Sequence, residues 1–272
     1  MKTKKPSVFL ITGAASGIGA AMARLAVAQG HHVMLADVNA SGVTAVARSI
    51  GDSAAATQLD IRSADAWEKA LDATVERFGR IDVLLNNAAV VHTGYARDVP
   101  LELHQRTMDT NFIGPLTGTL AALRRFRTQG HGHVLTVCSM TAFLPFPGIA
   151  SYGASKQALR AFHHAVALEE RETPIHFTIV HPTSTETPML EQERNDDAAS
   201  LAFVSEPVTP EFVANVVMTA FRKKSIEVFM PPEQAYALRL LGTNPKKMRE
   251  LFDQMDSIGK EAQRVARMEA RS

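Results

Sequence analysis

Short apolar runs alternate with amphipathic stretches from the start of the chain to about Met230. This alternation predicts β-α-β units around a parallel sheet, because strands and crossover helices take turns along such a chain. Most of the runs are apolar on successive residues, as expected of strands that are covered on both faces. The predicted strands are residues 8–11, 33–36, 57–59, 83–85, 134–137, 177–180 and 226–229.

Several stretches between these runs have the spacing of a helix face. The side chains that carry it are Ile18, Met22, Leu25 and Gln29 in one stretch, and Trp67, Leu71, Val75 and Phe78 in another. Thr209, Pro210 and Glu211 supply an N-cap, a first-turn proline and a first-turn acid, so another helix is predicted to begin there. No repeat, low-complexity tract or linker divides the chain before Met230, which favours one doubly wound α/β domain.

Composition narrows the class of protein further. The chain has 272 residues, 46% of them apolar, and its net charge is +1. Because no long basic run precedes the C-terminal tail, nucleic-acid binding has little support. The single cysteine, Cys138, excludes an internal disulfide, and the first apolar run is too short for a signal peptide. No apolar stretch is long enough to span a membrane, so we expect a soluble, cytoplasmic protein with no metal site.

A glycine-rich turn lies between the first predicted strand and the first predicted helix, over residues 12–19. Gly13 permits a tight turn, Gly17 lets backbone amides approach a phosphate, and Gly19 lets the helix pack closely on the sheet. Backbone amides and the positive end of the helix can then hold a pyrophosphate. The turn therefore predicts a dinucleotide site that includes Ser16 and Ile18.

Asp37 ends the second predicted strand about 20 residues after the glycines, where a carboxylate can accept hydrogen bonds from the adenosine ribose. A 2'-phosphate at that place would be repelled by the carboxylate, and neither Ser16 nor Val38 supplies a compensating cation. These residues predict NAD as the cofactor in preference to NADP.

Tyr152 and Lys156 lie four residues apart in a helical stretch, so their side chains share one helix face. Ser139 follows the apolar run at residues 134–138. A free tyrosine has a pKa near 10, and an adjacent ammonium stabilises the phenolate and lowers that pKa. Ser139 can hold a substrate oxygen while Tyr152 exchanges a proton and a nicotinamide exchanges a hydride.

At this point the sequence resembles the short-chain dehydrogenase/reductase family over roughly residues 6–231. The motifs that carry the resemblance are the glycine turn, Asn86-Asn87-Ala88-Ala89, Asn111, Ser139, the Tyr152/Lys156 pair and residues 182–187. The resemblance implies a Rossmann-type, seven-stranded parallel sheet with helices on both faces, and a homo-oligomer, either a dimer or a tetramer. It also implies a catalytic tetrad of Asn111, Ser139, Tyr152 and Lys156, in which Asn111 holds a water near Lys156.

By the same resemblance, Asp60 and Ile61 border the adenine, Asn87 contacts the cofactor ribose, and Thr185 and Thr187 contact the nicotinamide carboxamide. The predicted cofactor-binding residues are Gly13, Ser16, Gly17, Ile18, Gly19, Asp37, Val38, Asp60, Ile61, Asn87, Ala88, Tyr152, Lys156, Pro182, Thr185 and Thr187. The chain departs from the family at Ala89, Thr183 and Thr185, where a glycine, a glycine and an aliphatic residue are usual. Asn111 is expected in a helix that Gly114 and Pro115 disturb, which frees a backbone carbonyl.

Substrate identity is expected to depend on the loop after Pro182, about residues 187–208, and on residues 90–95 and 143–149, because these segments follow strand ends. Phe143, Leu144, Phe146, Pro147 and Ile149 make an apolar wall that favours a hydrophobic alcohol or ketone, or they pack beneath the loop. Residues 185–188 through 205–207 also look similar to reductases of long-chain ketosphingoid bases, which suggests a lipid-like substrate. Asp37 does not suit the NADPH preference of those reductases.

The chain continues past the family resemblance as residues 232–272, a predicted helical extension of the domain at residues 1–231. An apolar stripe marks an amphipathic helix there, formed by Met248, Leu251, Phe252, Met255, Ile258, Ala262 and Val265. We favour a helix that packs on its own subunit or a neighbour; a lid or a membrane contact is the alternative.

The sequence thus predicts an NAD-dependent oxidoreductase that interconverts a secondary alcohol and a ketone. One alternative is an NADPH-dependent carbonyl, ketoacyl or ketosphinganine-like reductase, which Asp37 disfavours. An alternative from another class is a catalytically silent NAD-binding regulatory protein, which the complete tetrad disfavours.

Overall fold

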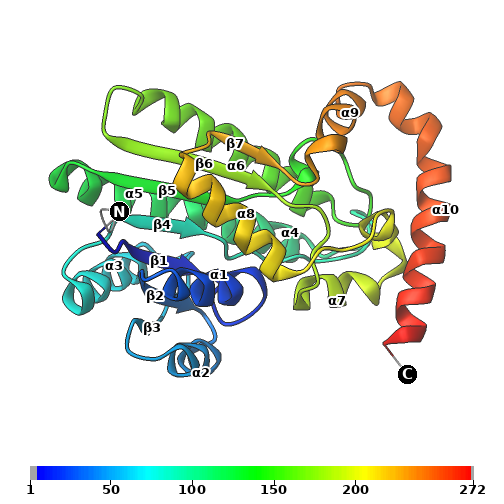
Figure 1. Ribbon diagram of the computed structural model, residues 1–272. Helices are drawn as coiled ribbons and strands as arrows, with labels where there is room; N and C mark the ends of the chain where they lie inside the picture. The colour runs from blue at the N-terminus through cyan, green and yellow to red at the C-terminus, as the bar shows by residue number, and fades with distance from the viewer. Residues whose placement is uncertain (1–4, 271–272) are drawn as a thin grey trace.

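One parallel sheet organises the molecule (Figure 1). The structure, a computed structural model, describes residues 5–270, apart from the side chains of residues 233–235. Seven strands lie in the order β3-β2-β1-β4-β5-β6-β7, and each strand pairs with its neighbours in parallel. The strands are β1 Val8–Thr12, β2 His32–Asp37, β3 Ala54–Gln58, β4 Val83–Asn86, β5 Gly132–Val137, β6 Ile175–His181 and β7 Glu227–Phe229.

Helices cover the sheet on both faces and continue beyond its last strand (Figure 1). The α-helices are α1 Gly17–Ala28, α2 Ala40–Ile50, α3 Ala64–Phe78, α4 Leu101–Met108, α5 Gly114–Gln129, α6 Ala150–Glu169, α7 Pro188–Arg194, α8 Pro210–Lys223, α9 Pro232–Gly242 and α10 Pro245–Glu269. Three further helical segments are η1 Asp109–Ile113, η2 Met140–Ala142 and η3 Asp197–Phe203. The strand order reverses between β1 and β4, and sheets of this kind bind ligands beside that switch point, at the carboxyl ends of the strands.

All seven predicted apolar runs overlap strands, but the third was placed too far along the chain. We predicted residues 57–59, whereas β3 spans Ala54–Gln58. Its first three residues are alanines, which give a weak apolar signal, and β3 is an edge strand that pairs only with β2. The pairing of those alanines with β2 defines the strand, and pairing is not readable from a short window of sequence.

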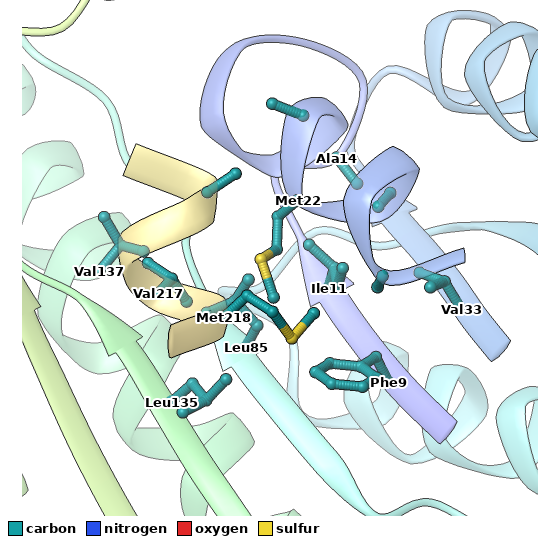
Figure 2. Packing of buried hydrophobic residues seen from close by; sticks show 14 of the residues in the cluster. Phe9, Ile11, Ala14, Met22, Val33, Leu85, Leu135, Val137, Val217 and Met218 are labelled. Carbon is teal, nitrogen blue, oxygen red and sulfur yellow. The ribbon is translucent and has the colours of Figure 1, made fainter. Parts of the chain in front are cut away.

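The two faces of the sheet have separate cores because side chains alternate along each strand. Phe9 and Ile11 of β1 contact the α1 and α8 side, where Met22 and Met218 lie together over the sheet (Figure 2). Leu10 faces the other side, in a core built with α3 and α5. Trp67 of α3 is fully buried there, and a Cβ on Gly118 of α5 would lie only 2.3 Å from its ring.

The predicted C-terminal amphipathic helix is α10, and it packs within this chain rather than standing free. It runs alongside η3 and α7 at the end of the molecule that holds the strands' carboxyl ends (Figure 1). Asn244 caps its first turn by accepting a hydrogen bond from the Lys247 amide at 3.0 Å. The close approach uses Gly259, where a Cβ would lie 2.3 Å from the carbonyl oxygen of Ser200. In residues 5–270, none of the helices is both long and apolar enough to cross a membrane.

Candidate active site

A single cavity of about 560 Å³ opens at the carboxyl ends of the strands. Sixteen of the predicted site residues line it: Gly13, Ser16, Gly17, Ile18, Asp37, Val38, Asp60, Ile61, Asn87, Ala88, Ser139, Tyr152, Lys156, Pro182, Thr185 and Thr187. Two of them, Gly19 and Asn111, lie behind its wall. The fold therefore brings together residues that are up to 174 positions apart in the sequence.

The glycines of the turn between β1 and α1 allow its backbone to fold tightly, so that Gly19 lies against Gly13. Gly13 has φ +66° and Gly17 has φ +52°, in the left-handed region that favours glycine. A Cβ on Gly19 would lie 2.2 Å from the carbonyl oxygen of Gly13. We expect Gly19 to let the helix pack closely on the sheet; its missing side chain leaves room both for the turn's own backbone and for Asn87, directly after β4, whose Nδ2 would lie 2.8 Å from a Cβ at this position.

The start of α1 is open to an anion. Ser16 is the N-cap residue of α1, yet its side chain makes no capping hydrogen bond. The first backbone N–H groups of a helix have no partner within the helix and carry its positive end. A hydroxyl, free amides and glycines without side chains together fit the pyrophosphate of a dinucleotide.

Asn87 holds this turn in place from the end of β4. Its amide nitrogen Nδ2 donates hydrogen bonds to the carbonyl oxygens of Thr12 at 2.9 Å and Gly13 at 3.2 Å. The backbone amide of Asn87 donates to Thr12 Oγ1 at 3.0 Å. The amide end of this side chain is therefore committed to the glycine turn, and only the remainder of Asn87 faces the cavity.

Asp37 presents a fixed carboxylate to the cavity. Its Oδ2 accepts a hydrogen bond from the Ala15 amide at 3.0 Å, and its Oδ1 accepts one from the Asn39 amide at 2.9 Å. Each carboxylate oxygen has capacity for a second donor. The carboxylate is therefore already oriented, with the capacity to accept the two hydroxyls of a ribose, and this arrangement fits NAD.

One cation near the adenine end was missed by sequence reasoning. Arg62 lines the cavity, and its Nη2 lies 2.5 Å from Asp60 Oδ2. The Arg62 guanidinium holds the pKa of the Asp60 carboxyl below its ordinary value. Because the Arg62 guanidinium is paired with Asp60, it is not free to bind the 2'-phosphate of NADP. Nothing in the spacing of residues 60–62 indicated this pairing.

Ser139, Tyr152 and Lys156 meet at the other end of the cavity. The Ser139 hydroxyl lies close enough to the Tyr152 phenol to lower the pKa of that phenol. Lys156 Nζ lies 5.5 Å from the centre of the Tyr152 ring and donates to the carbonyl oxygen of Val137 at 3.4 Å. The segment that follows β5 and the helix α6 thus place a hydroxyl, a phenol and an ammonium at the same end of the cavity.

The electrostatics of Tyr152 differ from our expectation. Removal of the phenol from water raises its pKa well above 10, and the nearby Glu193 carboxylate raises it further, while the Ser139 hydroxyl lowers it. We expected Lys156 to lower the Tyr152 pKa, but burial dominates in this structure and also lowers the pKa of Lys156 itself. Burial therefore keeps the phenol of Tyr152 in its protonated form in this structure.

Asn111 lies in the disturbed helix that Gly114 and Pro115 predicted. The segment η1 is a π-helix, in which backbone hydrogen bonds shift by one residue and leave a carbonyl group without its usual partner. The Asn111 side chain is fully buried and pairs with the backbone of Val90 in both directions, at 2.8 Å each. Its side chain is thus occupied, and only its backbone carbonyl is suited to hold a water.

Some residues of the predicted substrate segments line the cavity, and others pack behind its wall. Val90, Val91, Leu144, Phe146 and Ile149 line the cavity, and they are apolar. Phe143 instead packs on His181 and Phe229, with ring centres 4.8 and 5.4 Å apart. Tyr95 and Pro147 are not among the lining residues either. The apolar run at residues 143–149 therefore has two parts. Leu144, Phe146 and Ile149 belong to the cavity wall, and Phe143 packs against β6 and β7.

The loop that follows Pro182 closes over the glycine turn. A Cβ on Gly17 would lie 3.0 Å from Thr187 Cγ2, so the two segments are in contact. Thr185 Oγ1 donates to the carbonyl of Thr183 at 3.0 Å, and Thr187 Oγ1 donates to the carbonyl of Thr185 at 3.2 Å. Thr185 also bridges to Val208, which ties the two ends of the loop together.

Residues of the C-terminal extension also line the cavity. Leu238 of α9 and Met255 of α10 line it, together with Leu201 of η3. We expect this helix to pack on its own subunit or a neighbour, with a lid or a membrane contact as the alternative; α10 packs within the chain, and its Met255 is part of the cavity wall. Met255 belongs to the apolar stripe that predicted the helix, but nothing in the stripe showed which of its members faces a ligand.

Gln263 ties α10 to the substrate loop. It is 1% exposed, and its Nε2 donates to the carbonyl oxygens of Glu193 at 2.9 Å and Asp196 at 2.8 Å. Gln263→Leu is expected to remove both of these hydrogen bonds, while each carbonyl keeps one backbone donor, and to lower the free energy of unfolding by about 1–3 kcal/mol. Thermal unfolding measures this loss. Gln254→Leu, at an exposed position of α10, is the control and should change little; equal losses in the two variants would contradict the role given to Gln263.

Glu193 is a buried acid that sequence reasoning also missed. It is 8% exposed, and burial raises the pKa of its carboxyl from 4.5 to about 7. A raised folded-state pKa stabilises the protein fully below about pH 4.5, and this stabilisation is lost as the pH rises through about 7. At about pH 8 the ionised carboxylate therefore destabilises the fold by about 2–3 kcal/mol relative to a neutral group.

Glu193→Gln is accordingly expected to raise the melting temperature by roughly 5 °C at about pH 8 and to change it little at about pH 4. Melting curves of both proteins across this pH range test the prediction. Glu191→Gln, on the same helix but with an exposed carboxylate, should show no such pH dependence. A gain for Glu193→Gln that is equal at both pH values would show that the carboxyl is not destabilised by burial.

The chain is similar in sequence to known oxidoreductases. A family model described as short chain dehydrogenase matches residues 7–198. The 3-alpha-(or 20-beta)-hydroxysteroid dehydrogenase of Mycobacterium bovis is 31% identical over 212 residues, which are 78% of this chain and 80% of that protein. The uncharacterized oxidoreductase YxnA of Bacillus subtilis is 30% identical over 249 residues, which are 89% of this chain and 70% of that protein.

A solved structure is similar over most of the chain. The crystal structure of 3-ketoacyl-(acyl-carrier-protein) reductase from Brucella melitensis complexed with NADH has a TM-score of 0.75 and 29% sequence identity. The match covers 82% of this chain and 95% of that one. The fold is therefore shared with this reductase.

Proposed function

This chain belongs to the short-chain dehydrogenase/reductase family, and from that premise we propose that it is an NAD-dependent oxidoreductase that interconverts a secondary alcohol and a ketone. Oxidoreductase activity on hydroxyl or carbonyl groups follows from the family. NAD preference and the residue roles are our proposal. The observation that carries it is that one cavity joins the carboxylate of Asp37 to the Ser139, Tyr152 and Lys156 cluster.

The proposed chemistry uses Ser139 and Tyr152 to bind the substrate oxygen. In the oxidising direction Tyr152 accepts the hydroxyl proton, while bound NAD supplies the hydride acceptor at the carbinol carbon. Lys156 holds a positive charge beside the Tyr152 oxygen and stabilises the phenolate that must form, by loss of the phenol proton, before Tyr152 can accept the proton of the alcohol. In the reducing direction Tyr152 returns the proton to the ketone oxygen. The raised Tyr152 pKa suits this second role, because a protonated phenol is ready to donate.

The proton is proposed to leave through Lys156 toward Asn111. Because the Asn111 side chain is occupied by Val90, the group assigned to hold a water is its backbone carbonyl in η1. We propose contacts with the nicotinamide end from Pro182, Thr185 and Thr187, and contacts with the adenine end from Asp60 and Ile61. The tyrosine, the lysine and the glycine turn would complete the cofactor site.

The preference for NAD rests on Asp37 and on the pairing of Arg62. A 2'-phosphate beside Asp37 would place two negative groups together, and Arg62 is already bound to Asp60. The alternative, an NADPH-dependent carbonyl or ketoacyl reductase, needs a free cation beside Asp37. Arg106 of α4 also lines the cavity, but the acid on which its charge acts is Asp60. Val38 is 63% exposed beside the cavity and supplies none.

A homo-oligomer, either a dimer or a tetramer, is also proposed. Ile113 of η1, Leu120 of α5 and Leu168 of α6 are 41%, 43% and 66% exposed, which leaves apolar side chains on these helices to be covered. Light scattering of the purified protein measures the subunit number, and a monomer at micromolar concentration would contradict the proposal. A cytoplasmic location stays a prediction of the sequence.

The enzymatic proposal is tested by a screen of secondary alcohols with NAD, followed at the NADH absorbance band. Apolar alcohols are expected to be oxidised, because most of the substrate wall is apolar. If the protein binds NAD but oxidises none of them and reduces none of the matching ketones, it is the silent regulatory alternative.

A further inference from the structure

The substrate end of the cavity contains one acid that the proposed reaction does not use. Glu193 lines the cavity from α7 and is 8% exposed, and apart from Gln192 several of the residues that line this part of the wall are apolar. Those apolar residues include Met189, Leu190, Leu201 and Met255. An acid in such a wall is costly to keep, which makes its presence informative.

The Glu193 carboxyl has no partner of its own in the part of the chain that the structure describes. Burial alone shifts its pKa, with no cation or hydrogen bond from a described residue offsetting that burial. The neighbouring acid on the same helix differs, since Glu191 lies 2.5 Å from Arg194. Glu193 therefore has unused capacity to accept hydrogen bonds, and that capacity faces the cavity.

The backbone of Glu193 is held rigidly although its carboxyl is free. Gln263 of α10 binds its carbonyl oxygen at 2.9 Å, and the same amide binds Asp196 at 2.8 Å. On the next element, Ser200 Oγ donates to Asp256 Oδ1 of α10 at 2.6 Å. The extension thus fixes the helix that carries Glu193, and a fixed acceptor discriminates between ligands better than a mobile one.

The carboxyl lies near the reacting group. The charge of Glu193 is close enough to Tyr152 to raise its pKa. A substrate whose hydroxyl is bound by Ser139 and Tyr152 therefore extends toward an acceptor in the same cavity. Its remaining surface contacts the apolar residues between the two ends.

We propose that Glu193 recognises a second hydrogen-bond donor on the substrate, so that the preferred substrate is a largely apolar secondary alcohol with a further hydroxyl or ammonium group. This inference deepens the proposed alcohol–ketone reaction and rests on it. A substrate carboxylate is disfavoured at this place, because it would meet a second acid in a water-poor wall. An alcohol without the second donor leaves the Glu193 carboxyl unpaired.

Five alcohols with a matched seven-carbon chain test the proposal. They are heptan-2-ol, heptane-1,6-diol, 7-aminoheptan-2-ol, 7-methoxyheptan-2-ol and 6-hydroxyheptanoate. The methoxy compound accepts but does not donate a hydrogen bond, so it separates donor recognition from polarity. Oxidation of the secondary hydroxyl is followed with NAD, and the ketone product is identified by mass spectrometry.

The wild-type enzyme is expected to favour the diol or the amino alcohol over heptan-2-ol by about tenfold or more in kcat/KM. The methoxy compound should gain nothing, and the carboxylate should be the poorest substrate. In Glu193→Leu the advantage should fall to about onefold, and Glu193→Gln should lose the advantage of the ammonium in particular. Preference for the diol alone identifies a hydroxyl as the natural donor, and preference for the amine alone identifies an ammonium.

Glu191→Gln is the matched control, since it removes an exposed acid from the same helix and should leave every ratio unchanged. The proposal is overturned if neither donor is favoured, or if the advantage survives in Glu193→Leu. Binding of the same compounds to the NAD-loaded Tyr152→Phe variant gives a second readout that needs no turnover. If no alcohol is oxidised but donor binding depends on Glu193, the proposed reaction fails and the recognition role stands; absence of donor-dependent binding overturns the recognition role.

Discussion

Tyr152→Phe is expected to lower kcat by about a thousandfold or more while NAD binds with nearly unchanged affinity. The substitution removes only the phenol oxygen, which lies near the Ser139 hydroxyl and is the proposed acid and base. The ring, which lies beside Lys156, keeps its shape. Steady-state rates with the best alcohol of the screen and a titration of NAD by fluorescence measure the two quantities.

The control for this prediction is Tyr95→Phe, which removes a phenol oxygen outside the cavity. That variant should keep the wild-type rate. Retention of more than about a tenth of the wild-type kcat by Tyr152→Phe would refute the assignment of the proton transfer. Loss of NAD binding together with the rate would show instead that the substitution disturbs the cavity.

Replacing Asp37 by Ala and Val38 by Arg is the second change with a large expected effect. The double variant loses the carboxylate that repels a 2'-phosphate and gains a cation at an exposed position beside the cavity. We expect the ratio of kcat/KM for NAD to that for NADP to fall by about a hundredfold or more. The ratio is measured with one alcohol and both cofactors at the same ionic strength, since salt screens the added charge.

Asp37→Asn separates the two causes in this prediction. It keeps an acceptor and removes the negative charge, so NADP should improve while NAD loses only part of its efficiency. An unchanged ratio in the double variant would show that the ribose contact lies elsewhere. A wild-type enzyme that already favours NADPH by about tenfold would refute the choice of cofactor itself.

The sheet was predictable because most of its strands are continuous apolar runs in the sequence. Residues 8–11 and 177–180, covered by helices on both faces, were located within a few positions. The edge strand β3 was misplaced, because three alanines carry little hydrophobic signal and only the pairing with β2 defines them. Element ends that depend on a neighbour cannot be read from local sequence.

The catalytic cluster was predictable for a different reason. Tyr152 and Lys156 share a helix face, and the glycines of the first turn have conformations that few other residues adopt. The resemblance to a family added Ser139 and Asn111, whose distance along the chain from Tyr152 no spacing rule spans.

Contacts made by the fold could not be predicted in the same way. The pairing of the Asn111 side chain with Val90, and the commitment of Asn87 to the glycine turn, depend on which loops meet. Glu193 looked like one acid among several in a polar stretch, and only the burial of α7 beneath α10 makes it distinctive. The expected lowering of the Tyr152 pKa failed likewise, since desolvation follows from the folded structure rather than from residue identity.

Transfer of a labelled hydrogen tests the central claim most directly. The wild-type protein is mixed with NAD and heptane-1,6-diol that carries deuterium on the secondary carbinol carbon, and the reduced cofactor is analysed by mass spectrometry. If the Ser139, Tyr152 and Lys156 cluster oxidises an alcohol onto NAD in this cavity, deuterated NADH and the methyl ketone form in equal amounts. Absence of reduced cofactor, or reduced cofactor without the label, would contradict direct hydride transfer at this site.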